Sequence, residues 1–327
     1  MRQVEEALRV YAGGGSSDRR TRFAQLASLI PHSFKGELIL EHRMDEERFQ
    51  ALAWETRRYL SASLGYAGRV LSEEQIVETF SDPKTFVPNK TPNGLLMPKA
   101  ELTMEFNMVH KCFAELLGAL GFDHLTDGWQ LPLNVRVVGG QVDPATRNRP
   151  YSTSKIHSDT WVGEPSDAIL LNVPLLGDIE RTTIEWFQVP VEVGDSFLRP
   201  LKDFTEGEEV VRQATRVDVT PKIGHIYFSD FALLHRTVRK DGRCRISLDL
   251  RIRMKTSAAA KAQVDAKSAS DRLEEYVPFA LWMSIGQRAL VVIPETMEEC
   301  RQLQANPSTS RKGFAPYTIV AYLPSER

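Results

Sequence analysis

The stretch RCRISLDLRIRM, residues 243–254, alternates strictly between polar and apolar side chains. Because successive side chains of a β-strand point to opposite faces, a period of two predicts one long strand with an apolar face and a polar face. Such a polar face fits either a solvated outer surface or a polar cavity lined from inside a barrel. It carries five charged groups and one hydroxyl: Arg243, Arg245, Ser247, Asp249, Arg251 and Arg253.

Short β-rich runs, among them DAILLNVPLL and TTIEWFQVPVEV, fill most of the sequence from residue 125 to 254. Gly, Pro and Asp separate these runs at intervals typical of an all-β sandwich or barrel. Before them, residues 45–64 and 101–120 have apolar residues at helical spacing, and Asp45 stands at the N-cap position of the first segment. We therefore expect a β-rich α+β protein in which helices precede a β core.

We expect a single structural domain with three parts. Residues 1–124 form an N-terminal arm and helices that pack on the core, residues 125–254 form the core itself, and residues 255–327 form a cover of helix and strand. With 42% hydrophobic and 26% charged residues, the 327-residue chain has the composition of a globular protein.

Charge and cysteine content disfavour several classes of protein. A net charge of −2 gives no overall field to attract nucleic acid or an anionic membrane, and no apolar run reaches the ~18 residues of a membrane span. The three cysteines lack CxxC spacing, so we expect neither a disulfide framework nor a zinc–cysteine site. The N-terminus lacks the apolar core of a secretory signal. We therefore expect a cytoplasmic protein of unknown oligomeric state that acts on a small molecule.

The segment IHSDTW, residues 156–161, places His157 and Asp159 two positions apart in what reads as extended chain. In extended chain these two side chains point to one side, so they can share one metal ion. The best candidate for a third ligand is His235, which follows an apolar run and precedes a basic turn. Two histidines and one carboxylate, with coordination positions left open, suit non-haem Fe(II).

Arg245 follows His235 by ten residues, and Ser247 lies two residues further on the same strand face. A guanidinium group binds a carboxylate through two parallel hydrogen bonds, and a nearby hydroxyl can add a third. A hairpin through residues 239–242 would return this pair to the metal ligands. A metal at one end and a carboxylate clamp at the other are what 2-oxoglutarate needs, because its keto-acid end chelates iron while its far carboxylate meets the arginine.

With these residues in place, the sequence resembles the Fe(II)/2-oxoglutarate-dependent dioxygenases. HSD at residues 157–159, His235, and RIS at residues 245–247 are similar to the HxD…H…RxS pattern of that superfamily. The stretch after the HxD motif resembles its phytanoyl-hydroxylase-like and antibiotic- or sugar-biosynthesis branches. The resemblance covers residues 125–254 and implies a double-stranded β-helix, or jelly roll, with flanking helices. It also implies that Fe(II) and 2-oxoglutarate support the oxidation of a C–H bond.

Several further residues are candidates for the site, and each has a structural alternative. Thr183 can donate a hydroxyl hydrogen to 2-oxoglutarate or simply begin a strand. Trp161 can lie against the substrate or pack the loop after the HxD motif, and Arg136 can face the cavity. We expect Asp249 to pair with a neighbouring arginine.

Residues 236–255 carry eight basic side chains, opposed only by Asp241 and Asp249. One 2-oxoglutarate molecule needs only one arginine, so the surplus indicates either an anionic primary substrate or a solvated turn. On a straight strand Arg251 and Arg253 lie too far from Arg245 to reach the same cosubstrate, so they would serve another part of the cavity, its rim or a partner surface. We expect an anionic group on the substrate to be met instead by the arginines that flank the hairpin: Arg236, Arg239 and Arg243.

The primary interpretation is an Fe(II)- and 2-oxoglutarate-dependent oxygenase of a small molecule in natural-product or sugar metabolism. Hydroxylation, desaturation and related oxidations all remain open. The alternatives are a cupin-like metal enzyme, which would use the three metal ligands without needing Arg245, and a non-catalytic jelly-roll binding module.

Overall fold

The computed structural model describes most of the chain up to residue 254 and three short segments beyond it. The described residues are 19–87, 89–91, 93–96, 98, 102–121, 126–130, 132–141, 149–254, 276–277, 290–292 and 320–322. The N-terminal arm and most of the C-terminal cover expected from the sequence lie outside these residues. Among the described residues, none of the helices has the length and apolar character needed to cross a lipid bilayer.

Two antiparallel sheets form the core. The larger has nine strands, with a main path β1-β2-β9-β6-β11-β4-β12, and β5 pairs with both β11 and β3. Its strands are β1 (Phe34–Lys35), β2 (Ile39–Arg43), β3 (Leu95–Leu96), β4 (Thr126–Gln130), β5 (Asn134–Val138), β6 (Ala168–Gly177), β9 (His225–Asp230), β11 (Arg245–Met254) and β12 (Tyr276–Val277).

The smaller sheet has the order β10-β7-β8. Its strands are β10 (Leu233–Arg239), β7 (Thr182–Gln188) and β8 (Thr215–Arg216). Trp186 on β7 stacks on Tyr227 of β9 with ring centroids 5.5 Å apart, so one face of the small sheet packs against the large one. The mixed α/β architecture with a large antiparallel sheet is compatible with the expected fold class.

Strand β11 confirms the alternation that its sequence predicts. Its even-numbered residues, such as Leu248 and Leu250, are fully buried in the main hydrophobic core. Buried residues of the helices, including Leu60 and Phe113, belong to the same core cluster. The polar face of β11 is also buried, since Arg245, Ser247, Asp249 and Arg253 are each at most 8% exposed. Of the two alternatives for the polar face of this strand, the structure therefore shows the enclosed one and not the solvated outer surface.

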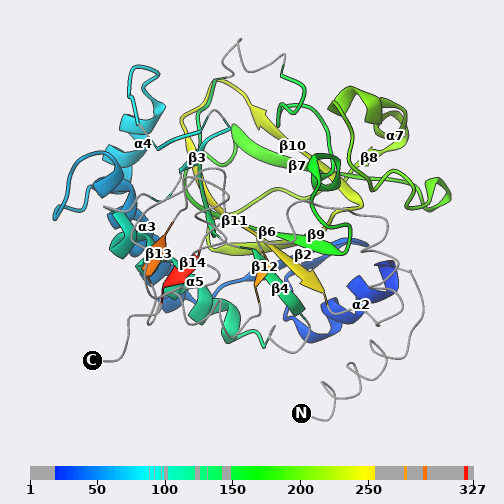
Figure 1. Cartoon of the computed structure of the whole chain (residues 1–327), viewed down its shortest axis with the longest axis horizontal. Helices are drawn as coiled ribbons and strands as arrows, with labels where there is room; N and C mark the ends of the chain where they lie inside the picture. Colours follow the sequence, from blue (N-terminus) through cyan, green and yellow to red (C-terminus); the bar gives the residue numbers. More distant parts are fainter. Residues whose placement is uncertain are drawn as a thin grey trace.

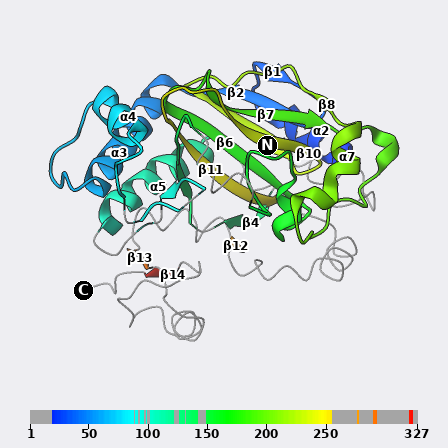
Figure 2. The same ribbon diagram turned by 90° about the horizontal axis from the view of Figure 1, so that it is seen from above.

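Helices gather on two sides of the sheets. Helices α3 (Glu46–Ser63), α4 (Glu73–Ser81) and α5 (Thr103–Gly118) lie together at one side, and α7 (Glu208–Gln213) lies at the other (Figures 1 and 2). Helix α2 (Arg19–Leu29) is the first described element, and short 3₁₀ turns occur at η3 (Asp159–Val162), η4 (Val191–Val193) and η5 (Phe204–Gly207). A separate two-stranded sheet pairs β13 (Leu290–Val292) with β14 (Val320–Tyr322).

The two helices predicted from apolar spacing are confirmed as α3 and α5, and Asp45 caps α3 by accepting a hydrogen bond from the Arg48 amide at 3.1 Å. The N-terminal part is not purely helical, however, because β1, β2 and β3 join the large sheet. Helix α4 was also missed. Its capping box has a sequence signal, a serine followed three residues later by a glutamine. In the structure the Ser72 hydroxyl accepts from the Gln75 amide, and the Gln75 side chain accepts from the Ser72 amide.

Gly177 ends β6 where that strand meets the start of β11. Its φ of +89° is unfavourable for other residues, and an added Cβ would lie 2.2 Å from the Cys244 carbonyl oxygen. Gly65 has a similar φ of +88° with no atom within 4 Å of such a Cβ. We expect Gly65→Ala to cost about 1–2 kcal/mol from backbone conformation alone. Gly177→Ala should cost about 1–3 kcal/mol more because of the clash.

Urea unfolding of the two variants and the wild type measures this difference. Equal losses of unfolding free energy in both variants would show that the close approach of Gly177 to the Cys244 carbonyl does not exclude a side chain at this position.

Candidate metal centre

His157 and His235 lie side by side through their backbones. The His157 amide donates to the His235 carbonyl at 3.0 Å, and the His235 amide donates back to the His157 carbonyl at 2.8 Å. The segment before η3 thereby extends the small sheet along β10. This pairing places both imidazoles on one surface, with ring centroids 4.4 Å apart.

Asp159 reaches the same place by a different backbone path from the one expected. His157 and Ser158 are extended, but the chain turns at Asp159 into the 3₁₀ turn η3. Ser158 makes this turn possible, because its buried hydroxyl accepts from the Thr160 amide and donates to the Phe231 carbonyl at 2.8 Å. The Ser158 side chain is engaged with the Phe231 carbonyl, and the turn rather than strand alternation aims Asp159 at the histidines.

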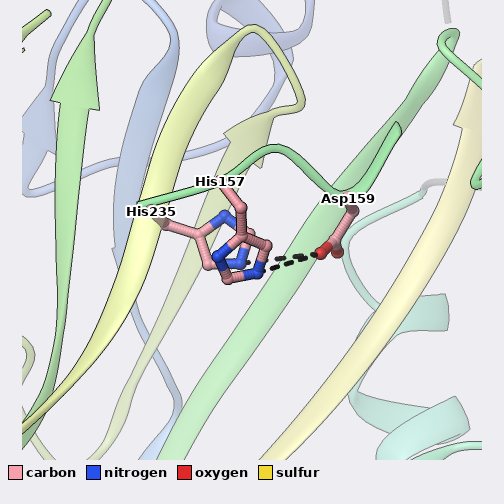
Figure 3. A group of neighbouring side chains, drawn as sticks. All are labelled: His157, Asp159 and His235. Atoms are coloured by element: carbon pink, nitrogen blue, oxygen red, sulfur yellow. Dashed lines mark ion pairs between the residues drawn. The ribbon is translucent and has the colours of Figure 1, made fainter. Parts of the chain in front are cut away.

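The three side chains converge (Figure 3). Asp159 Oδ1 lies 3.8 Å from His157 Nε2 and 3.6 Å from His235 Nε2. Two atoms that each bind one ion at about 2.0–2.2 Å are at most about 4.4 Å apart, so both distances fit a shared ion. His157, Asp159 and His235 form a group that could hold a metal ion.

Two contacts orient the His157 ring, one at its Nδ1 atom and one against its face. Its Nδ1 lies 2.8 Å from the Lys155 carbonyl, which can only accept, so Nδ1 carries the proton and Nε2 keeps a free lone pair. The ring also stacks on Phe204 of η5 at 4.4 Å between centroids. Such outer contacts fix the tautomer and ring direction that a metal ligand needs.

Arg251 holds the second oxygen of Asp159. Its Nε donates to Asp159 Oδ2 at 2.9 Å, while its Nη1 donates to Gln130 Oε1 at 3.2 Å and Glu164 lies 3.7 Å from Nε. This bond leaves Oδ1 facing the two imidazoles. Sequence reasoning placed Arg251 away from the cosubstrate but did not foresee its contact with Asp159, because the turn at η3 that brings the two together is a tertiary feature.

The protonation states suit a metal site. Burial, followed by the neighbouring His235, lowers the pKa of His157 to about 3, and burial also lowers the pKa of His235. Burial raises the pKa of Asp159, but Arg251 and then the two imidazoles outweigh it, so the pKa of this carboxyl lies below its usual range. Neutral imidazoles and an ionised carboxylate are the forms that bind metals.

Arg245 and Ser247 lie on the buried polar face of β11. Arg245 is 1% exposed, yet within the described part of the chain none of its three guanidinium nitrogens has a hydrogen-bond partner, and the Ser247 hydroxyl also has none. Burial lowers the pKa of Arg245 to about 10. An ionised group buried without a partner costs several kcal/mol, so this pair fits an anionic ligand such as the far carboxylate of 2-oxoglutarate.

The small sheet contributes an indole group that sequence reasoning missed. Trp186 pairs with His235 in the strand register, so both side chains lie on the face that packs against the large sheet, and the buried indole Nε1 has no partner among the residues described. The Thr183 hydroxyl likewise has none there, but alternation puts it on the opposite face, with Glu185 and Arg236. Only the strand register of β7 with β10 decides which of these two residues shares a face with His235.

Three other candidates have defined surroundings. Arg136 on β5 donates to Asp249 and to the Asn93 carbonyl, so Asp249 pairs with an arginine as expected. Trp161 is fully buried, donates to the Phe197 carbonyl at 3.0 Å, and belongs to a second apolar cluster with Phe204. These surroundings agree with the alternative in which Trp161 packs the loop after the HxD motif.

Arg251→Gln should weaken Fe(II) or Zn²⁺ binding by about 10–100-fold, because it releases Asp159 Oδ2 and lets the carboxylate rotate. The measurement is competition with a chelator under anaerobic conditions. Arg243→Gln is the matched control, since Arg243 is an exposed arginine that pairs with Glu74 instead. An unchanged metal affinity in Arg251→Gln, or an equal loss in the control, would contradict this role.

Comparisons with known proteins give distant structural matches. No protein-family model and no curated sequence matches the chain. The non-heme alpha ketoglutarate dependent epimerase SnoN from nogalamycin biosynthesis has 16% identity over 80% of this chain and 96% of its own, with a TM-score of 0.39. The corresponding values for the carbocyclase SnoK from the same biosynthesis are 14%, 72%, 96% and 0.32.

An N-substituted L-amino acid dioxygenase from Burkholderia ambifaria AMMD, in complex with alpha-KG, has 12% identity over 66% of this chain and 85% of its own, with a TM-score of 0.32. Alpha-ketoglutarate is another name for 2-oxoglutarate. The solved structures similar to this chain thus include non-heme alpha-ketoglutarate-dependent enzymes, at identities of 12–16%.

Proposed function

We propose that this protein is an Fe(II)- and 2-oxoglutarate-dependent oxygenase of a small molecule, built on a jelly-roll core. The observation that carries the proposal is the pairing of two features in one buried interior. A convergent group of two histidines and one carboxylate shares this interior with Arg245, whose three guanidinium nitrogens lack hydrogen-bond partners among the described residues.

The metal ligands are His157, Asp159 and His235. Three protein ligands leave open positions for a chelating cosubstrate and O₂, which is the arrangement that suits Fe(II) in oxygenases. When bound, iron supplies the O₂ chemistry, in which 2-oxoglutarate, O₂ and a substrate C–H group give succinate, CO₂ and a hydroxylated product. The chain itself orients the ligands, through Arg251, Lys155 and Phe204, and surrounds them with buried side chains.

The cosubstrate clamp consists of Arg245 and Ser247, two residues apart on one face of β11. Both groups are buried and lack partners among the described residues. A carboxylate could accept two parallel hydrogen bonds from the guanidinium and a further one from the hydroxyl. Binding it would offset the cost of burying Arg245, so the clamp is best matched to a ligand with a distal carboxylate.

The two alternatives differ in what they require of these residues. A cupin-like metal enzyme without 2-oxoglutarate would leave Arg245 buried with no anion. A non-catalytic binding module would not require the ligand set to keep its tautomer and carboxylate orientation. We favour the oxygenase because it uses both features, and we place its substrate in natural-product or sugar metabolism.

Succinate formation tests the function. Iron-loaded protein, 2-oxoglutarate and O₂ should yield succinate above the uncoupled background with a member of a panel of sugars, amino acids and aglycones. Asp159→Asn should abolish this yield, whereas Asp218→Asn, at an exposed position, should retain it. Turnover that persists in Asp159→Asn would refute the assigned ligand set.

Arg245→Lys should weaken 2-oxoglutarate binding by about tenfold or more, because lysine keeps the charge but loses the bidentate geometry. Calorimetric titration of the metal-loaded variant under anaerobic conditions measures this affinity. The control is Arg243→Lys, which changes an exposed arginine two positions earlier. Unchanged affinity in Arg245→Lys would remove the clamp from this residue.

A further inference from the structure

Most arginines around the β10–β11 hairpin already have acidic partners. On the outside, Arg236 pairs with Glu185 at 2.8 Å and Arg243 with Glu74 at 3.5 Å. In the interior, Arg251 pairs with Asp159, Arg253 pairs with Asp167 and Arg136 pairs with Asp249. Two members of this group, Arg239 and Arg245, have no acidic partner among the residues that the structure describes.

Arg239 is the last residue of β10. It pairs with Thr182 in the strand register, and its even spacing from His235 puts both side chains on the same face of β10. The side chain is partly buried, and its Nη1 donates to the Ser154 hydroxyl at 3.0 Å. Ser154 lies three residues before His157, so Arg239 is held beside the segment that supplies the metal ligands.

Charge does not balance around Arg239. Burial, followed by the neighbouring Arg136, lowers the pKa of Arg239, and Arg136 and Arg239 both lower the pKa of Arg245. Arg136 pairs with Ser247 in the strand register, so Arg136, Arg245 and Asp249 lie on one face of the large sheet, where Asp249 is the carboxylate that pairs with the group. Two positive charges remain, of which the far carboxylate of 2-oxoglutarate would offset one at Arg245.

We infer that Arg239 binds a singly charged oxyanion group of the primary substrate, such as a carboxylate. This inference rests on the proposed function, because it assigns Arg245 to the cosubstrate. Of the three hairpin arginines expected from the sequence to meet the substrate, the inference keeps one. Arg236 and Arg243 are paired with glutamates, so Arg239 alone of the three faces the interior with positive charge to spare.

The spacing along β10 restricts the shape of such a substrate. Arg239 and His235 are four residues apart, so their Cα atoms are separated by about 13 Å. The Arg239 guanidinium reaches the Ser154 hydroxyl, three residues before His157. The anionic group of the substrate therefore lies several bonds from the carbon that faces the iron, rather than next to it.

Two small probes test this inference without the natural substrate. Methanesulfonate carries one negative charge, and dimethyl sulfone has nearly the same shape with none. Iron-loaded protein saturated with 2-oxoglutarate is titrated anaerobically with each probe by calorimetry at low ionic strength, where charge pairs are least screened. The wild type should bind methanesulfonate and discriminate against dimethyl sulfone, and Arg239→Gln should weaken methanesulfonate binding by about tenfold or more.

The matched control is Arg243→Gln, in the same hairpin, which should bind methanesulfonate like the wild type. Equal binding of methanesulfonate to the wild type and Arg239→Gln, or no binding to either, would overturn the inference. If methanesulfonate competes with 2-oxoglutarate and Arg239→Gln loses affinity for both, Arg239 belongs to the cosubstrate clamp. That outcome overturns the inference while leaving the proposed function intact, whereas failure of 2-oxoglutarate to bind the wild type would refute both.

Discussion

The buried polar face of β11 sets the constraint that the rest of the interior satisfies. Burying charged side chains between two sheets is costly unless each finds a partner. Asp249 pairs with Arg136, Arg251 with Asp159 and Arg253 with Asp167, and each of these pairs ties β11 to another segment. Arg245 has no hydrogen-bond partner among the residues that the structure describes, so the same strand also carries one buried cation that could bind an anionic ligand.

The three candidate metal ligands depend on that constraint through Arg251. The reciprocal backbone bonds between His157 and His235 bring the imidazoles together, but Asp159 follows a turn and would have freedom to rotate. The bond from Arg251 to Oδ2 fixes the carboxylate with Oδ1 toward the histidines. One strand thus contributes to both ends of the candidate site, orienting a metal ligand at one end and presenting Arg245 at the other.

The sequence predicts those parts of this arrangement that depend on local pattern. Strict alternation identified β11 and the common face of Arg245 and Ser247, and apolar spacing identified α3 and α5. That Trp186, and not Thr183, shares a face with His235 was not predictable, and neither was the bond between Arg251 and Asp159. The first depends on how β7 pairs with β10, and the second on a 3₁₀ turn that brings together residues 92 positions apart. Both depend on tertiary contacts that no single segment contains.

A comparison of three small acids tests most directly whether metal and clamp serve one ligand. 2-Oxoglutarate has both a keto-acid end and a far carboxylate, pyruvate lacks the far carboxylate, and glutarate lacks the keto group. With Fe(II)-loaded protein under anaerobic conditions, calorimetry should show 2-oxoglutarate binding at least about tenfold more tightly than either of the others, because each loses one set of contacts. Pyruvate binding as tightly as 2-oxoglutarate, or 2-oxoglutarate binding equally well without metal, would contradict the account.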